Sequence, residues 1–212
     1  MTDQLSLYNG ALAVLGARKL ANLTENREPR HKLDDIWARD AVERCLQQGQ
    51  WNFATRSTQP AISASVTPSF GYTNAFEKPS DFIRTTGVCT DEYFNSPLTR
   101  YTDETGFWFA DEDVIYTRYV SNDLQYGFDF AIWPHNFTKF VELWIAVEVA
   151  PRLTGIEKSK EALQKELKNA KREAKATDAM EESVVFPPPG TWVRSRWGAV
   201  GGDRGSRNRL IG

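Results

Sequence analysis

Residues 137–154, FTKFVELWIAVEVAPRLT, constrain the fold more than any other stretch of the chain. Their apolar side chains occupy most of a helical wheel, and this pattern predicts a helix that other elements cover on nearly every side. Pro134 suits the first turn of such a helix, and Pro151 must kink or end it because proline has no amide hydrogen. Lys139, Glu142 and Glu148 interrupt the stretch, which is also too short to span a bilayer. We therefore expect a central core helix over residues 134–154.

Three further helices are predicted around it. Residues 2–15 carry one apolar stripe, which predicts the first helix. Residues 29–48 carry a second apolar stripe, and Pro29 suits the first turn of that helix. Residues 157–182 have as many acids as bases and only a narrow apolar stripe, so most of that helix should face water or a partner. The residues of this stripe are Leu163, Leu167, Ala170 and Ala174.

The sequence changes character over residues 55–122, where short β-favouring runs alternate with Pro, Gly, Asn and Asp. We expect strands at about 61–66, 83–90, 100–102, 106–110 and 114–120, joined as an antiparallel meander. The predicted fold class is therefore α+β: mainly an α-helical bundle with an inserted small antiparallel β-meander and an extended C-terminal arm. Residues 1–182 should form one domain, and residues 183–212 the arm.

The predicted arm differs from the rest of the chain in charge. Its five arginines face one acid, Asp203, which gives residues 183–212 a charge of +4 and leaves −6 for residues 1–182 out of a total of −2. These arginines are Arg194, Arg196, Arg204, Arg207 and Arg209. Val184 and Phe186 precede a stiff triple proline, and Trp192 and Trp197 follow it beside Arg194 and Arg196. Such a segment should gain its shape only against a partner.

Catalytic and metal-binding motifs are scarce. The sequence has no phosphate loop, no dinucleotide glycine fingerprint and no His-Glu-x-x-His helix. His31 and His135 lie in no nucleophile motif, so we expect structural roles for both. Cys45 and Cys89 lack the neighbouring ligands of a zinc site and are interpreted as buried thiols. We therefore predict no enzyme, no catalytic residue, no cofactor and no metal, and the sequence shows no signal peptide or membrane span.

One enzymatic alternative stays open at this stage. Five acids lie in two predicted hairpin turns, and a pair of carboxylates is what glycoside cleavage requires. Solvated acids are also common in turns, which favours a structural reading. The five are Asp103, Glu104, Asp111, Glu112 and Asp113.

Three stretches carry a resemblance to a known family. SLYNGALAVLGARKLANLTENREPRHKLDDIWARDAVERCLQQGQWNFA resembles the start of head-to-tail adaptor proteins of short-tailed bacteriophages, the group of the tail tubular protein A and related tail accessory factors. AFEKPSDFIRTTGV and NFTKFVELWIAVEVAPRLTGIEKSKEALQKELKNAKREA resemble the strand and the helices that follow in that family. The resemblance spans about residues 6–174, and its landmarks are Gly16, Leu23, Trp51, Pro79 and Trp144.

The resemblance implies a structural virion protein at the head–tail junction, assembled in the host cytoplasm. Members of the family form a dodecameric ring between the portal protein and the tail nozzle, and the genome passes through the ring during DNA ejection without specific binding. An acidic body fits such a channel wall, because like charge keeps DNA from adhering.

Two sets of interface residues are predicted on this basis. We expect the arm to bind the portal, and we expect the aromatic run Phe107, Trp108 and Phe109 to meet the tail or a neighbouring subunit, or else to form a buried strand. The predicted portal-binding residues are Val184, Phe186, Trp192, Arg194, Arg196, Trp197, Arg204, Arg207 and Arg209. The alternatives are a DNA-binding protein that uses the Arg/Trp arm, a tail-associated cell-wall hydrolase, and a connector of a long-tailed phage.

Overall fold

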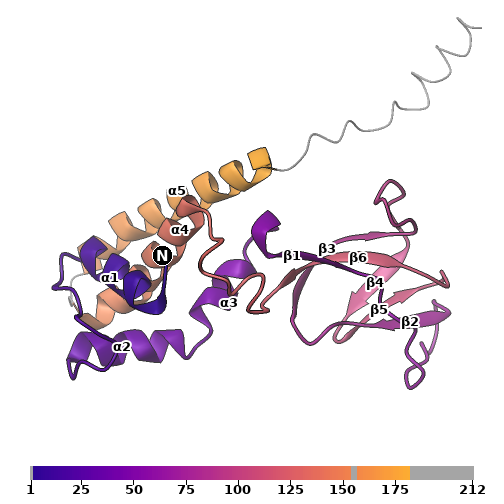
Figure 1. Ribbon diagram of the computed structural model, residues 1–212, viewed down its shortest axis with the longest axis horizontal. Coiled ribbons are helices and arrows are strands. Elements are labelled where there is room, and N and C mark those ends of the chain that lie inside the picture. The colour runs from indigo at the N-terminus through magenta and orange to yellow at the C-terminus, as the bar shows by residue number, and fades with distance from the viewer. Residues whose placement is uncertain (1, 154–156, 182–212) are drawn as a thin grey trace, which may run out of the picture. The chain divides into compact units, whose positions relative to one another are not determined.

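The computed structural model describes residues 2–153 and 157–181 and shows a mixed α+β fold (Figure 1). The predicted arm lies outside the described residues. The helices are α1 (Gln4–Val14), α2 (Glu28–Trp37), α3 (Ala41–Leu46), α4 (His135–Leu153) and α5 (Glu157–Glu181), with a 3-10 turn η1 (Asn52–Ala54). The strands are β1 (Thr55–Thr58), β2 (Asn74–Glu77), β3 (Phe82–Cys89), β4 (Tyr101–Glu104), β5 (Phe107–Ala110) and β6 (Tyr116–Ser121).

Helix α4 is the centre of the main core, as its sequence predicts. It packs against α1, α2, α3 and α5, and its apolar residues are buried around most of its circumference. Pro151 lies in its last turn, close to the end that the sequence places there. The aromatic part of this core is a set of ring contacts in which Phe137 lies 4.8 Å from Trp51, 4.8 Å from Phe53 and 4.9 Å from Trp133.

Helix α5 packs along α4 through the narrow stripe that the sequence predicts. Leu163, Ala170 and Ala174 are buried, whereas most of the other described side chains of α5 are exposed. Asp178 is a buried exception near the end of the helix. Its carboxylate accepts the amide hydrogen of Asn52 at 2.8 Å, and its carbonyl oxygen accepts the Asn52 side-chain amide at 2.7 Å. These bonds attach the end of α5 to η1, just before the first strand.

The single helix predicted over residues 29–48 is wrong, because the structure has two helices there. Helix α2 ends at Trp37, and Asp40 then adopts the left-handed conformation with φ 58° and ψ 44° before α3 begins. Aspartate enters that region more easily than most residues. The break lets α2 and α3 each pack against α4. The apolar pattern continues across the break, so it does not signal the change of direction.

The predicted meander is also wrong, because the strands form two sheets with non-sequential neighbours. Sheet A has the order β1-β6-β3 and sheet B the order β2-β5-β4, all antiparallel. Only β4 and β5 form the expected local hairpin, at Gly106 with φ 84°. The two sheets share a core to which both contribute side chains. Its buried members are Phe76, Val88, Trp108, Ala110 and Ile115.

The first predicted strand, at 61–66, does not form a strand. That segment instead crosses beside β2, where Ile62 makes an isolated bridge to Phe76 and the Ser63 amide donates to the Ala75 carbonyl oxygen at 2.7 Å. The flanking Pro60 has no amide hydrogen and restricts longer pairing. The segment therefore covers part of the β2 edge without extending sheet B.

Gly127, in the segment after β6, lies too close to Ser121 and Leu46 to carry a side chain. A Cβ atom at this position would lie 2.2 Å from the Ser121 carbonyl oxygen and 2.8 Å from Leu46 Cδ1. Because the nearer atom belongs to the backbone, we expect Gly127→Ala to lower the free energy of unfolding by about 1–3 kcal/mol, as overpacking does. Urea unfolding followed by circular dichroism measures this. Gly87→Ala is the control, since no atom lies within 4 Å of its Cβ position; equal losses in both variants would contradict the packing.

Candidate interaction surface

The strand register places two phenylalanines on the outward face of sheet B. Phe107 is paired with Glu77 on one side and Glu104 on the other, and Phe109 is paired with Ala75 and Thr102. Directly paired residues point to the same side of a sheet. The rings of Phe107 and Phe109 lie 6.2 Å apart at 14°, and both side chains are partly exposed. We call Glu77, Thr102, Glu104, Phe107 and Phe109 the outer face of sheet B.

A neighbouring loop enlarges this aromatic surface. The Thr102 hydroxyl donates to the Tyr72 hydroxyl at 3.0 Å, and Phe70 on the same loop is 88% exposed. Residues 66–72, together with Thr102, Glu104 and Phe109, line a hollow of about 360 Å³. Large exposed apolar side chains beside a hollow are typical of a surface that meets another protein. Sequence reasoning missed Phe70 and Tyr72 because they lie in a loop with no periodic pattern.

Trp108 does not belong to this surface, which corrects the grouping of the three aromatics. It is 0% exposed, and its Nε1–H donates to the Thr85 hydroxyl at 2.9 Å. Its ring meets the Phe82 ring edge-on at 5.5 Å in the core between the sheets. Strand alternation turns Trp108 inward wherever Phe107 and Phe109 point outward. Of the three aromatics, only the two phenylalanines are therefore accessible to a partner.

Lys78 fixes the β4–β5 hairpin beneath the outer face. Its side chain is only 7% exposed, forms an ion pair with Asp103 and donates to the Glu104 carbonyl oxygen at 2.6 Å. The ammonium also lies 4.5 Å above the Phe82 ring. A buried ammonium needs such partners because losing water is costly. Asp103 in turn accepts the Thr85 hydroxyl, so the position of Glu104 is set by a network of internal bonds.

The acids of the two predicted turns are spread over separate contacts. Asp103 is paired with Lys78, and Asp111 accepts the amide of Thr73 at 3.2 Å and its hydroxyl at 3.0 Å. Arg100 lies 3.5 Å from the same Asp111 carboxylate. Glu104, Glu112 and Asp113 are exposed. Asp103 and Asp111 therefore each have their own partners, and these contacts do not bring the two carboxylates together.

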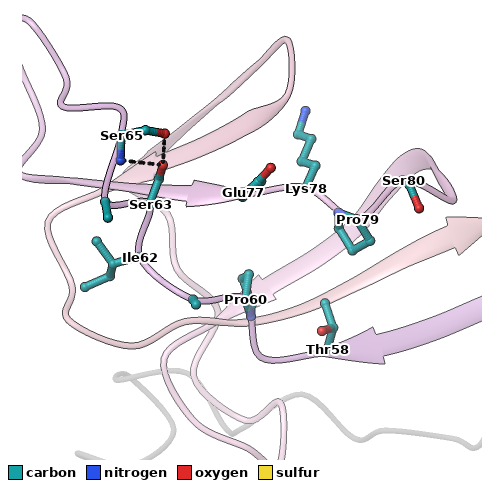
Figure 2. Close-up of a pocket in the computed structure, with 11 residues that line it drawn as sticks. Thr58, Pro60, Ile62, Ser63, Ser65, Glu77, Lys78, Pro79 and Ser80 are labelled. Atoms are coloured by element: carbon teal, nitrogen blue, oxygen red, sulfur yellow. Dashed lines mark hydrogen bonds between the residues drawn. The ribbon is translucent and has the colours of Figure 1, made fainter.

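Figure 2 shows a second hollow, of about 590 Å³, next to the end of β2. Pro60 and Pro79 lie on its walls, and Ser63 and Ser65 form a hydrogen-bonded pair at 3.2 Å. Glu77 and Lys78 supply its charged groups, and its lining contains neither histidine nor cysteine. The hollow offers hydroxyl groups and proline rings, which suit contact with a peptide segment.

A cluster of cations lies where α5 approaches sheet A. Lys171 and Lys175 are one helical turn apart on α5, and Arg84 on β3 donates to the Gln47 carbonyl oxygen at 3.3 Å. Burial, followed by the charges of Lys171 and Arg84, lowers the pKa of Lys175. Among the described residues, the ion pairs involve none of these three cations. We call Arg84, Lys171 and Lys175 the basic patch.

The remaining candidate residues have structural surroundings or lie outside the described residues. Cys45 and Cys89 are free and buried, as predicted, and burial raises the pKa of both thiols. His31 is exposed beside Asn26, and His135 begins α4. Within residues 2–153 and 157–181, no three side chains of the metal-binding types come together. All nine predicted portal-binding residues lie beyond the described part of the chain.

Comparisons with known proteins leave the family open. No family model matches the chain, and no curated protein matches it significantly. A search of the described helices finds none that is long and apolar enough to cross a membrane.

Proposed function

We propose that this chain is a structural interface protein, whose task is to bind other proteins. The observation that carries this proposal is the outer face of sheet B, where Phe107 and Phe109 stack in partial exposure beside an 88%-exposed Phe70. Leaving such aromatic area in water is unfavourable unless a partner covers it. The exposed side of α5 and the basic patch offer further contact surface.

More specifically, we propose the head-to-tail adaptor of a short-tailed bacteriophage. In this proposal the helices around α4 are the bundle of the adaptor, copies of the chain form a ring of twelve, and the ring joins the portal protein to the tail nozzle at the head–tail junction of the virion. Assembly takes place in the host cytoplasm. The sequence resemblance over residues 6–174 supports this choice, as does a charge of −6 on residues 1–182, which lets genomic DNA pass without adhering.

The arm has a defined role in this proposal. Residues 183–212 bind the portal protein through their arginines and their interspersed Trp and Phe side chains, because arginine pairs with carboxylates and aromatic side chains supply contact area. The outer face of sheet B meets the tail or a neighbouring subunit. No enzymatic step is required of any residue.

Removal of the arm is the direct test. We expect the full-length chain to join the portal protein of the same phage, and a version ending at Glu182 to lose this binding, as measured by native mass spectrometry of the mixture. A full-length variant with serine at all five tail arginines separates charge from length and should bind at least tenfold more weakly. If the shortened chain joins as well as the intact one, the arm is not the portal contact; if the intact chain does not join, the adaptor proposal fails.

A further inference from the structure

We propose that the basic patch of one copy of this chain binds the outer face of sheet B of the next copy. This inference rests on the proposed ring, and it names the residues that join neighbouring subunits. The partner of the outer face is then a second copy of the chain and not the tail. The two surfaces are complementary in charge and are built from different residues of the same chain.

The outer face has the chemistry to bind a guanidinium or ammonium group. Phe107 lies between Glu77 and Glu104, one on each neighbouring strand. Residues paired directly across strands have Cβ atoms about 4.5–5.5 Å apart, so both glutamates leave the sheet on the same side as the ring and can reach a cation bound there. A cation above an aromatic ring is attracted to its face, and carboxylates on either side add charge-assisted hydrogen bonds. Both Glu77 and Glu104 are exposed and available for this.

The basic patch supplies the matching cations. Arg84 and Lys175 are exposed and Lys171 is partly exposed, and the ion pairs among the described residues include none of the three. After burial, the charges of Lys171 and Arg84 lower the pKa of Lys175, which places the three cations close together. Arg84 is held by its bond to the Gln47 carbonyl oxygen, which leaves further N–H groups of the guanidinium for a partner. A carboxylate-bearing surface placed here would relieve the repulsion among the three cations.

The two surfaces lie on opposite outward faces of the paired sheets. Arg84 is paired with Val120, which packs into the helical core, whereas the next residue, Thr85, bonds to Trp108 in the core between the sheets. Arg84 therefore points away from sheet B. Phe107 and its flanking glutamates lie on the side of sheet B opposite to Trp108, and so point away from sheet A.

This placement favours a head-to-tail contact. A two-fold dimer through either surface alone would bring like charges together, whereas joining the patch of one copy to the outer face of the next brings opposite charges together. Each copy then has one donor surface and one acceptor surface. Repeating such a contact gives a ring when the rotation closes.

Charge reversal in two sets of variants tests the contact. The first variant is E77R/E104R, with a positive outer face, and the second is R84E/K175E, with a negative patch. Each alone opposes like charges, so we expect its self-association constant, measured by sedimentation at low salt, to fall by on the order of 100-fold from that of the parent chain. An equimolar mixture of the two should associate again. The positive outer face of the first variant then meets the negative patch of the second, and the positive patch of the first meets the negative outer face of the second.

The quadruple variant E77R/E104R/R84E/K175E is the internal control, since it reverses both surfaces and should self-associate within about tenfold of the parent. Circular dichroism melting verifies that each variant is folded. Association that is unchanged in the two double variants, or that returns in neither the mixture nor the quadruple variant, would overturn the proposal, as would a parent chain that does not self-associate. Because the assay contains no portal protein, its result is separate from that of the arm-deletion test.

Discussion

Replacing Trp51 by alanine is expected to lower the free energy of unfolding by about 3–5 kcal/mol, the usual cost of removing a large aromatic side chain from a core. Trp51 is 1% exposed and lies at the end of the helical part, directly before η1. Its ring is 4.8 Å from Phe137 and 6.1 Å from Phe140, so its loss leaves a cavity against α4. Its Nε1–H also donates to the Leu46 carbonyl oxygen at 3.1 Å, which closes the turn after α3.

Guanidinium unfolding followed by far-ultraviolet circular dichroism measures this loss. Phe70→Ala removes an aromatic ring of similar kind from a position that is 88% exposed, and is expected to change the free energy of unfolding by less than about 0.5 kcal/mol. Trp51→Phe keeps most of the packing but removes the indole donor. Its decrease in the free energy of unfolding should therefore lie between those of Trp51→Ala and Phe70→Ala. A Trp51→Ala loss no larger than that of Phe70→Ala would show that the core is not organised around this contact.

The parts of the fold that sequence predicts well are those set by local pattern. The helix predicted from apolar residues on nearly every side is α4. The sparse apolar stripe predicted over residues 157–182 supplies the buried side chains Leu163, Ala170 and Ala174 of α5. Glycine commonly ends a helix, and Gly16 follows α1 with φ 67°. In each case a residue's immediate neighbours decide its conformation, so the periodicity is sufficient.

The parts that sequence did not predict depend on distant partners. β1 pairs with β6 across some sixty residues, with Thr55 opposite Val120, and no local feature of either strand specifies that choice. The break at Asp40 is also decided by packing, because a continuous helix would carry α3 away from α4. The two hydrogen bonds that Asn52 donates to Asp178 connect α5 to the segment before β1, and no sequence motif marks either residue.

The candidate surface shows the same division. The aromatic run at 107–109 is visible in the sequence, within the strand predicted over 106–110. Alternation along that strand places Trp108 on one side and Phe107 and Phe109 on the other. Which side of that strand faces the core depends on sheet A, which sequence reasoning did not find. The pairing of Glu77 and Glu104 with Phe107 likewise depends on the order β2-β5-β4.

Asp81 is the residue whose loss should most affect sheet A. Its carboxylate accepts hydrogen bonds from Arg56 at 3.1 Å, from the Tyr119 hydroxyl at 3.1 Å and from the Ser121 hydroxyl. Asp81→Asn replaces an acceptor of three donors with a neutral amide that leaves some of them unpaired. Since its side chain is only 13% exposed, we expect the free energy of unfolding at pH 7 to fall by about 2–3 kcal/mol, within the range for hydrogen bonds to a charged group.

The pH dependence of this loss identifies the charged form of Asp81 as its cause. Burial by itself raises the pKa of Asp81, but the hydrogen bonds from Ser121, Arg56 and Tyr119 outweigh it and lower the pKa below its ordinary value. The unfolded chain therefore takes up the proton at a higher pH than the folded chain, and acid favours unfolding. The stabilisation is complete above the unfolded pKa of about 4 and is lost as the pH falls through the lower, folded value.

Urea unfolding of the parent chain and of Asp81→Asn across a pH series tests this sign. The difference between the two should be constant from about pH 7 to pH 5 and should shrink below about pH 4. Glu112→Gln, at an exposed acid in the turn after β5, is the matched control and should track the parent throughout. A difference that instead grows in acid would mean that Asp81 is protonated in the folded chain, and Arg56 would then lack the anion that orders the junction of β1 with β6.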